Sequence, residues 1–298
     1  MARDWEDTFR SWASPPSKTE QDKCTHAETA IRGAISNNLS VWQRNINVFP
    51  KGSYRNRTNV RLDSDVDICA LCIDSFFFDL PDGTTPGDFG ISTLAQYSYQ
   101  EYKNDIEISL VSQFGEDAVT RGNKAFDVHE NTYRVDADVV ACFEYRRYSS
   151  NGTYIEPTGA AFNTDNGQRI INWPEQNYQN GVRKNSATGR RFKSVVRVLK
   201  RLRNEMSDVG YDLAGSVPSY LIECLVWNVP NEGFGHDTYM ADIRYTLAHL
   251  FNATINDENC HEWGEINELK YLFRASQPWN RSQAHAFLDA AWDYIGLE

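Results

Sequence analysis

Two aspartates alternate with apolar residues in the segment "DSDVDICAL", residues 63–71. Asp65 and Asp67 flank Val66, and a strand sends residues i and i+2 to the same face, so both carboxylates would project together. Two like charges held side by side are costly unless something neutralises them. Hard carboxylate oxygens suit Mg²⁺ or Mn²⁺, so a divalent cation would remove that cost.

A second acidic strand is predicted in "NTYRVDADVVACFEYRRYSS", residues 131–150. Its alternation places Asp136 and Asp138 on one face, opposite a set of apolar residues. Together with Asp65 and Asp67, Asp138 would give three carboxylates on one sheet face. Two metal ions about 4 Å apart could then activate an attacking hydroxyl and stabilise a leaving pyrophosphate. Because Asp-x-Asp occurs by chance in many acidic proteins, the triplet alone does not establish catalysis.

The dipeptide Gly52-Ser53 precedes the first acidic strand and follows the short predicted strand "NINVFP", residues 45–50. Glycine permits close approach of the backbone, so exposed amides and the Ser53 hydroxyl could hold a terminal phosphate. The distance along the chain from Gly52 to Asp65 suits a triphosphate that spans both motifs.

Basic residues are concentrated in one segment of an acidic chain, whose formal net charge is −11. Residues 176–204 contain no Asp or Glu but many Lys and Arg. The net charge argues against long nucleic acid as a partner, and the basic segment indicates a compact anionic ligand. Within it, an apolar stripe is expected at Phe192, Val195, Val196, Leu199 and Leu202, with Lys193, Arg197 and Lys200 on another face.

The six cysteines are scattered through 298 residues, which is unlike a disulfide scaffold, and we expect them to be reduced. Cys69 and Cys72 lie three apart on a predicted strand and would face opposite ways, so we expect them to be buried and without a metal. No apolar run is long enough to span a bilayer, and the first residues lack the order of a signal peptide. We therefore expect a cytoplasmic protein with no membrane partner.

The order of predicted elements indicates an α/β lobe followed by a helical lobe. We expect a helix over residues 17–37, further helices over 93–102 and 105–114, a loop rich in Gly and Pro at 79–90, and hairpins and loops rich in Gly, Asn and Pro at 151–181. Beyond these loops the pattern predicts helices over 188–204, 218–227, 238–251, 262–273 and 282–294. We place the domains at 1–155 and 156–298.

The segments "GSYRNRTNVRLDSDVDICAL" and "VDADVVACF" resemble the DNA polymerase β-like nucleotidyltransferases, and most closely the bacterial cGAS/DncV-like enzymes called CD-NTases. The helices "RRFKSVVRVLKRLRN" and "VPSYLIECL" are similar to the helical lobe of that group. The resemblance covers most of the chain. It implies an α/β (α+β) fold, with a polymerase β-like core sheet, a C-terminal helical lobe and an active site in the cleft between them.

The resemblance also implies roles for individual residues. Gly52 and Ser53 match the phosphate-holding turn, and Asp65 and Asp67 match the first two metal ligands. Asp138 matches the third ligand, because "DVVACF" fits the family's pattern of Asp, two apolar residues and a small one. Asp136 remains the alternative third ligand.

Three residues of the helical lobe match nucleotide-binding positions of the family. A lysine of the basic helix holds the donor phosphates in that family, and Lys200 in "RVLKRL" is the expected one, with Lys193 as the alternative. Ser219 is expected to contact phosphate and Tyr220 to stack on the donor base. A core role for Tyr220 is the competing interpretation.

The resemblance predicts an enzyme that uses two Mg²⁺ ions, or Mn²⁺, to join ribonucleoside triphosphates into a cyclic di- or trinucleotide. In the family such products activate a separate effector in antiphage defence, and we expect this chain to act as a monomer. The alternatives are template-independent transfer to RNA or another acceptor, and a nucleotide sensor without activity. The sequence leaves open the bases, the linkage and the ring size.

Overall fold

The computed structural model describes residues 3–38, 41, 43–60, 65–93 and 95–297. The chain folds into two units, each with its own hydrophobic core. The sheet unit consists of Ser17–Arg55 and Ser64–Glu175, and the helical unit of Met1–Pro16, Asn56–Asp63 and Gln176–Glu298.

The described residues of the sheet unit form one mixed sheet in the order β1-β2-β5-β4-β3, with β6 paired to β5 and β7 paired to β6. The central pair, β2 and β5, is parallel, and every other pair is antiparallel. The strands are β1 Ile46–Pro50, β2 Val66–Asp79, β3 Val119–Arg121, β4 Phe126–Val128, β5 Ala137–Arg147, β6 Gly159–Asn163 and β7 Arg169–Asn172.

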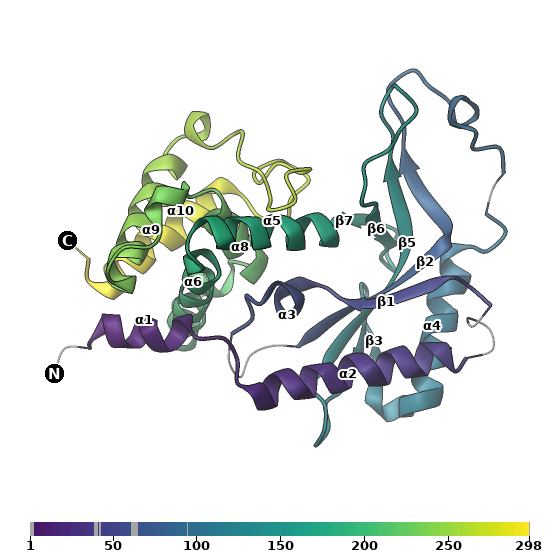
Figure 1. Cartoon of the computed structure of the whole chain (residues 1–298), viewed down its shortest axis with the longest axis horizontal. Helices are drawn as coiled ribbons and strands as arrows, with labels where there is room; N and C mark the ends of the chain where they lie inside the picture. The colour runs from purple at the N-terminus through teal and green to yellow at the C-terminus, as the bar shows by residue number, and fades with distance from the viewer. Residues whose placement is uncertain (1–2, 39–40, 42, 61–64, 94, 298) are drawn as a thin grey trace. The chain divides into compact units, whose positions relative to one another are not determined.

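Helices α2 (Lys18–Ser36) and α4 (Tyr99–Phe114) pack against the sheet in the same core as Ile68, Ala70 and Cys72 of β2 (Figure 1). Because side chains alternate along a strand, Asp67, Cys69 and Leu71 point to the other face. The burial of Val66, Ile68, Ala70 and Cys72 on one face fixes the register of β2, since a slip of one residue would turn Asp67 into the core.

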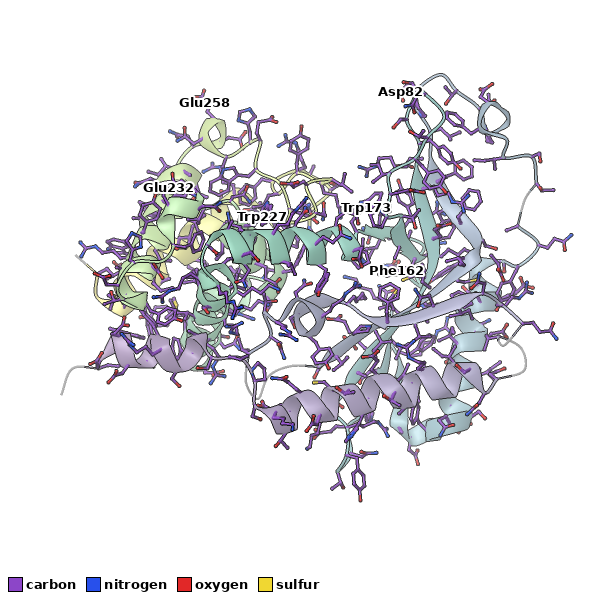
Figure 2. All side chains as sticks on the ribbon, in the orientation of Figure 1. Asp82, Phe162, Trp173, Trp227, Glu232 and Glu258 are labelled. Atoms are coloured by element: carbon purple, nitrogen blue, oxygen red, sulfur yellow. The ribbon has the colours of Figure 1, made fainter. Side chains whose placement is uncertain are left out.

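The helical unit is built around α6, whose apolar stripe shares one core with α1, α8, α9 and α10. Trp227, at the end of α8, packs edge-on against Phe192 of α6, and Figure 2 shows Trp227 and Glu232 in this unit. The helices are α1 Trp5–Ala13, α6 Arg191–Asp208, α7 Asp212–Gly215, α8 Ser219–Trp227, α9 Tyr239–Thr254 and α10 Arg281–Ile295. Two further helices, α3 Gly52–Asn56 and α5 Pro174–Ala187, contain two of the four points where the chain passes from one unit to the other.

The structure confirms most predicted elements but not all. A single helix, α4, replaces the two predicted between residues 93 and 114, and Ser98 begins it with a capping box. Residues 262–273 form turns and a bridge between Gly264 and Tyr271 instead of the predicted helix. Helices α1 and α5 were not predicted.

The two units also differ from the predicted domains 1–155 and 156–298. Residues 156–175 belong to the sheet unit, because β6 and β7 extend its sheet beyond β5. Residues 1–16 belong to the helical unit, because Phe9 of α1 is fully buried in the core around α6. Phe162 and Trp173, labelled in Figure 2, mark the end of the sheet unit, where Trp173 packs edge-on against Tyr145.

All six cysteines are buried and unpaired, as predicted for Cys69 and Cys72. Within the described part of the chain, no helix combines the length and apolar character needed to cross a membrane.

Candidate active site

Asp67 and Asp138 lie side by side at the start of the parallel strands β2 and β5, where they are direct register partners. Asp65 immediately precedes β2 and is exposed. On the other side of β5, Asp127 of β4 is the register partner of Asp138. The structure therefore brings the predicted pair Asp67 and Asp138 together and adds a neighbouring carboxylate that was not predicted.

Burial and the neighbouring carboxylates raise the pKa of Asp138. Burial raises the pKa of the Asp138 carboxyl above its ordinary value, and three nearby carboxylates raise it further: Asp67, Asp65 and Asp127. Lys51 opposes this shift but does not cancel it. Among the described residues around Asp138, the carboxylates that raise its pKa thus outnumber the cation that lowers it, which is the condition under which a divalent cation binds favourably.

Gly52 lies against the carboxylate of Asp67. Its φ of 62° is in the left-handed region, and a Cβ at this position would collide with the Asp67 carboxylate. Any other residue at this position would force the Asp67 carboxylate to shift. Ser53 follows in α3 and is half-buried.

Lys51, directly before Gly52, pairs with the same carboxylate. Its backbone N–H donates to the carbonyl oxygen of Asp67 at 2.8 Å, and its Nζ donates to Asp67 Oδ1 at 3.2 Å. The Lys51 side chain is 16% exposed, so the ammonium is largely withdrawn from water. A lysine thus provides part of the countercharge at the site.

Asp136, the alternative third ligand, lies outside the described strand β5, which begins at Ala137. Its Oδ1 accepts a hydrogen bond from the backbone N–H of Glu130 at 2.5 Å. This carboxylate is engaged in the turn that precedes the strand, whereas Asp138 is beside Asp67. The geometry therefore favours Asp138 as the partner of Asp67.

The donor set suits a hard cation, since aspartate oxygens are the ligands that Mg²⁺ and Mn²⁺ prefer. As their side chains stand, the described residues contain no group of three His, Cys, Asp or Glu that could hold a metal ion. Asp67 is turned to Lys51 instead. The residue types fit a divalent cation, and its binding would require Asp67 to exchange partners.

A cavity of about 470 Å³ in the sheet unit is lined by Phe49 and Leu71, among other residues. Leu71 shares its strand face with Asp67, because the two are separated by an even number of residues. The arginines that line the cavity are paired with carboxylates that also line it, Arg55 with Glu175 and Arg32 with Glu28. Its lining therefore combines apolar and polar side chains, and the charges of the arginines are balanced within it.

In the helical unit, Lys200 is only 2% exposed and is paired with the buried carboxylate of Glu223. The same carboxylate accepts a hydrogen bond from the Thr58 hydroxyl at 2.8 Å. The face of α6 that carries Lys200 was expected to be separate from its apolar stripe, yet it is buried as well. Lys200 thus serves as a charge partner inside the unit.

Lys193 is also largely buried, at 8% exposed, but its ammonium is in a different situation. Burial lowers the pKa of Lys193, the guanidinium groups of Arg57 and Arg197 lower it further, and the Glu223 carboxylate opposes the shift without cancelling it. Among the described residues, no carboxylate lies within ion-pair distance of its Nζ. Arg197 is itself occupied, since it donates to the backbone carbonyls of Ala13 and Arg57. Lys193 therefore lies beside other cations, and the carboxylate that acts on it, Glu223, is already paired with Lys200.

Ser219 and Tyr220 begin α8, as predicted, and both side chains have partners. Ser219 Oγ accepts from Arg203 Nη2 at 2.5 Å. The hydroxyl of Tyr220 donates to the carboxylate of Glu265 at 3.0 Å, and Asn177 Oδ1 lies 3.1 Å away. These contacts hold the half-buried Tyr220 ring at one end. Its predicted stacking on a base stays a prediction.

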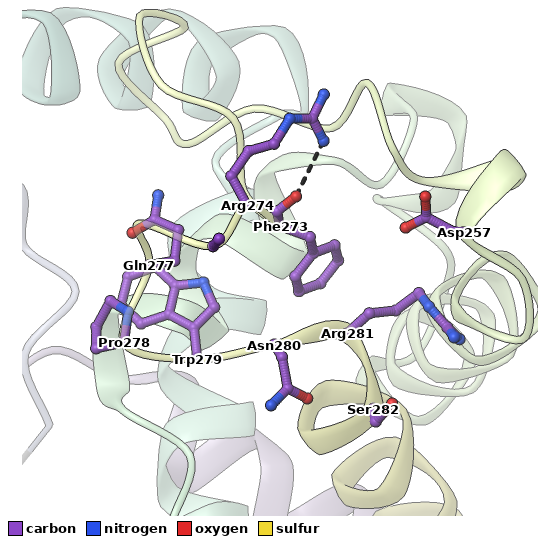
Figure 3. A pocket seen from close by; sticks show the side chains of 10 residues that line it. Asp257, Phe273, Arg274, Gln277, Pro278, Trp279, Asn280, Arg281 and Ser282 are labelled. Atoms are coloured by element: carbon purple, nitrogen blue, oxygen red, sulfur yellow. Dashed lines mark hydrogen bonds between the residues drawn. The ribbon is translucent and has the colours of Figure 1, made fainter.

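The helical unit has a cavity of about 590 Å³ next to the start of α10, lined by Arg274, Trp279 and Arg281 (Figure 3). Both arginines donate to backbone carbonyls, Arg274 to that of Phe273 at 2.9 Å and Arg281 to that of Ile255 at 2.9 Å. The indole N–H of Trp279 is likewise bonded to the backbone. The polar groups of this cavity therefore support the fold around it.

Two residues of the site were missed by sequence reasoning. Lys51 could have been found from its position next to Gly52-Ser53, since any side chain there lies beside the predicted phosphate turn. Asp127 could not have been found, because its relation to Asp138 depends on the pairing of β4 with β5.

Comparisons with known proteins extend over the whole chain. The family of cGAS/DncV-like nucleotidyltransferase C-terminal helical domains matches residues 179–296. A Legionella pneumophila protein named cyclic dipyrimidine nucleotide synthase CdnE is 46% identical over 298 residues, and a Cecembia lonarensis protein of the same name is 43% identical over 296 residues; each match covers 99% of both chains. The solved structure of Elizabethkingia meningoseptica CdnE cyclic dinucleotide synthase with GTP and Apcpp matches with a TM-score of 0.82 at 34% identity over 98% of each chain.

Proposed function

This chain belongs to the cGAS/DncV-like nucleotidyltransferases, and from that premise we propose that it joins two pyrimidine ribonucleoside triphosphates into a cyclic dinucleotide and releases pyrophosphate. The observation that carries the proposal is the pairing of Asp67 with Asp138 beside Gly52, in a site with excess negative charge. The choice of pyrimidines is supported by the names of the two relatives above 40% identity.

The residues of the sheet unit would bind the reacting phosphates and accept a proton. We propose that Gly52 and Ser53 hold the terminal phosphates, and that Asp65, Asp67 and Asp138 hold two Mg²⁺ ions, or Mn²⁺. Bound there, these ions would neutralise charge on the triphosphate and make a ribose hydroxyl more acidic. The carboxylate of Asp138 would accept the proton of that hydroxyl, and its raised pKa suits this role.

The residues of the helical unit would bind the donor nucleotide. We propose Lys193, in place of Lys200, as the lysine that holds the donor phosphates, because the Lys200 ammonium is already paired with Glu223. A phosphate would give Lys193 the ion-pair partner that no described carboxylate provides, since Glu223 is paired with Lys200. Ser219 would contact the same phosphates, and Tyr220 would present its ring to the base.

The product would act as a signal, and we propose that it activates a separate effector in antiphage defence without contact between the two proteins. Nucleoside triphosphates are cytoplasmic metabolites, so we expect the reaction to take place in the cytoplasm. We propose that the chain is active as a monomer.

The test is the product itself. The purified protein is incubated with Mg²⁺ and either UTP and CTP, ATP and GTP, or all four nucleotides, and then treated with phosphatase. We expect a phosphatase-resistant species of dinucleotide mass whenever pyrimidines are present, since a ring has no terminal phosphate. A resistant product that requires purines would refute the pyrimidine choice. Extended ladders on an added RNA primer, without a resistant product, would favour template-independent transfer to RNA.

A further inference from the structure

The ammonium of Lys51 has fewer partners than a buried lysine normally has. A lysine ammonium has three donors, and within the described part of the chain its one hydrogen-bond acceptor is Asp67 Oδ1 at 3.2 Å. Its other near neighbours include the thiols of Cys69 and Cys142, which are 0% and 1% exposed. These thiols are poor acceptors, so two N–H groups of a largely buried cation are left without a strong partner.

A second buried lysine in the same unit shows what full pairing looks like. Lys103, which is 1% exposed, donates to Asp165 Oδ1 at 2.7 Å and lies 3.4 Å from the carbonyl oxygen of Asn123. The Lys51 contact is longer, at 3.2 Å, and the Lys51 side chain is 16% exposed. Lys51 is therefore held loosely enough to change partners, while its position next to Gly52 keeps it beside the proposed phosphate turn.

We propose that Lys51 occupies the cation position at Asp67 until a nucleoside triphosphate binds, and that its ammonium then moves to the triphosphate and leaves Asp67 to the divalent cation. This inference rests on the proposed function, because it concerns the same carboxylates. Lys51 is a positioning residue in this scheme. Its consequence is that metal binding depends on nucleotide binding.

The dependence follows from competition for one carboxylate. A divalent cation that arrives alone must separate Asp67 from Lys51 and leave a buried ammonium without a counterion, which is costly. A triphosphate removes that cost, because its oxygens accept the N–H groups of Lys51 and also ligate the metal. Each ligand therefore increases the affinity of the other by the same factor.

The experiment measures Mn²⁺ binding by titration calorimetry, with and without a nonhydrolysable UTP analogue. We expect the wild-type protein to bind Mn²⁺ at least tenfold more tightly when the analogue is present. In Lys51→Met and Lys51→Gln, Mn²⁺ binding without the analogue should strengthen about tenfold, so that most of the dependence disappears. Thermal unfolding gives a second readout: Mn²⁺ alone should raise the melting temperature of these variants and leave that of the wild type nearly unchanged.

Lys124→Met is the matched control, because it removes the same charge from an exposed lysine of the same unit. It should behave as the wild type. If both Lys51 variants keep the wild-type dependence on nucleotide, or if Lys124→Met loses it equally, the inference about Lys51 is refuted. The proposed function is then unaffected, provided that the wild type binds Mn²⁺ with the analogue and Asp138→Asn does not. A wild type that binds no Mn²⁺ under either condition overturns both.

Discussion

The sheet unit and the helical unit differ in how they treat buried charge at their candidate sites. In the sheet unit, Asp67 and Asp138 lie side by side at the start of β2 and β5, and Lys51 is the cation that opposes them within the described part of the chain. In the helical unit, Lys200 is matched by Glu223, while Lys193 lies among cations. Paired charges such as Lys200 and Glu223 hold the fold together, whereas Asp138 in the sheet unit and Lys193 in the helical unit each lie beside charges of their own sign.

The largest effect is expected from removing one of the crowded carboxylates of the sheet unit. Asp138→Asn should reduce synthesis of the cyclic product by roughly a thousandfold or more, because the amide neither ligates a cation strongly nor accepts a proton. Without metal, the variant should unfold at the same temperature as the wild type or higher, since repulsion with Asp67 is removed. Product formation is followed by mass spectrometry and stability by thermal denaturation.

Asp136→Asn is the control for this prediction, because the side-chain amide oxygen of the asparagine can still accept the hydrogen bond from the backbone N–H of Glu130. It should retain activity within severalfold. The opposite order of the two effects would make Asp136 the third ligand.

The next prediction tests whether Lys200 stabilises the folded protein. Lys200→Met should lower the free energy of unfolding by about 3–5 kcal/mol, because it leaves the buried Glu223 carboxylate without a counterion. The double variant Lys200→Met/Glu223→Gln should recover much of that loss. Urea denaturation of the single and the double variant measures the free energy of unfolding. If Lys200→Met is instead fully stable and has lost nucleotide binding, Lys200 is the phosphate lysine that the sequence first indicated.

Much of the sheet unit could be predicted from the sequence because its pattern is local. The alternation around Asp67 and Asp138 specified two strands and the face that each carboxylate takes. What the pattern could not show was that Asp127 joins them, because that depends on how distant strands pair. The predicted domain boundary at residue 155 failed for the same reason, since β6 and β7 are separated from β5 by a loop and join it only through pairing.

In the helical unit, sequence reasoning identified α6 but not the surroundings of its lysines. The spacing of Lys193 and Lys200 fits a polar face, and both are nevertheless buried because α1 and α8 pack around α6. Lys200 has its counterion on another helix, α8, so no local pattern reveals it. Residues 262–273 were predicted as a helix because they are rich in helix-forming residues, and tertiary contacts override that preference.

A smaller effect concerns a charge in the sheet unit that is fully paired, Asp165. Hydrogen bonds from Arg121 and Lys103 lower the pKa of its carboxyl to about 2, although burial opposes the shift. The paired carboxylate thus stabilises the fold above its ordinary pKa, near pH 4, and this contribution is lost as the pH falls toward 2. Asp165→Asn should cost about 2 kcal/mol at pH 7, less than a fully buried pair, because its side chain is 36% exposed.

Urea denaturation at several pH values measures this contribution. The difference in unfolding free energy between wild type and Asp165→Asn should be constant above about pH 5 and shrink between pH 4 and pH 2. Asp82→Asn, in the exposed loop after β2, is the control and should change stability little at any pH. A difference that stays constant down to pH 2 would show that the charge of Asp165 contributes nothing.

The last prediction concerns the cations around Lys193. It compares the roles of the two lysines of α6, Lys193 and Lys200, in stability and in triphosphate binding. Lys193→Met removes a buried cation that has other cations beside it, so the free energy of unfolding should stay the same or rise, in contrast to Lys200→Met. Affinity for a nonhydrolysable triphosphate should fall by roughly 1–3 kcal/mol, the scale of one charge-assisted phosphate contact. Calorimetry measures the affinity and urea denaturation the stability. Stability that falls while affinity is preserved would give Lys193 the same structural role as Lys200, and the helical unit would then have no excess positive charge to offer a phosphate.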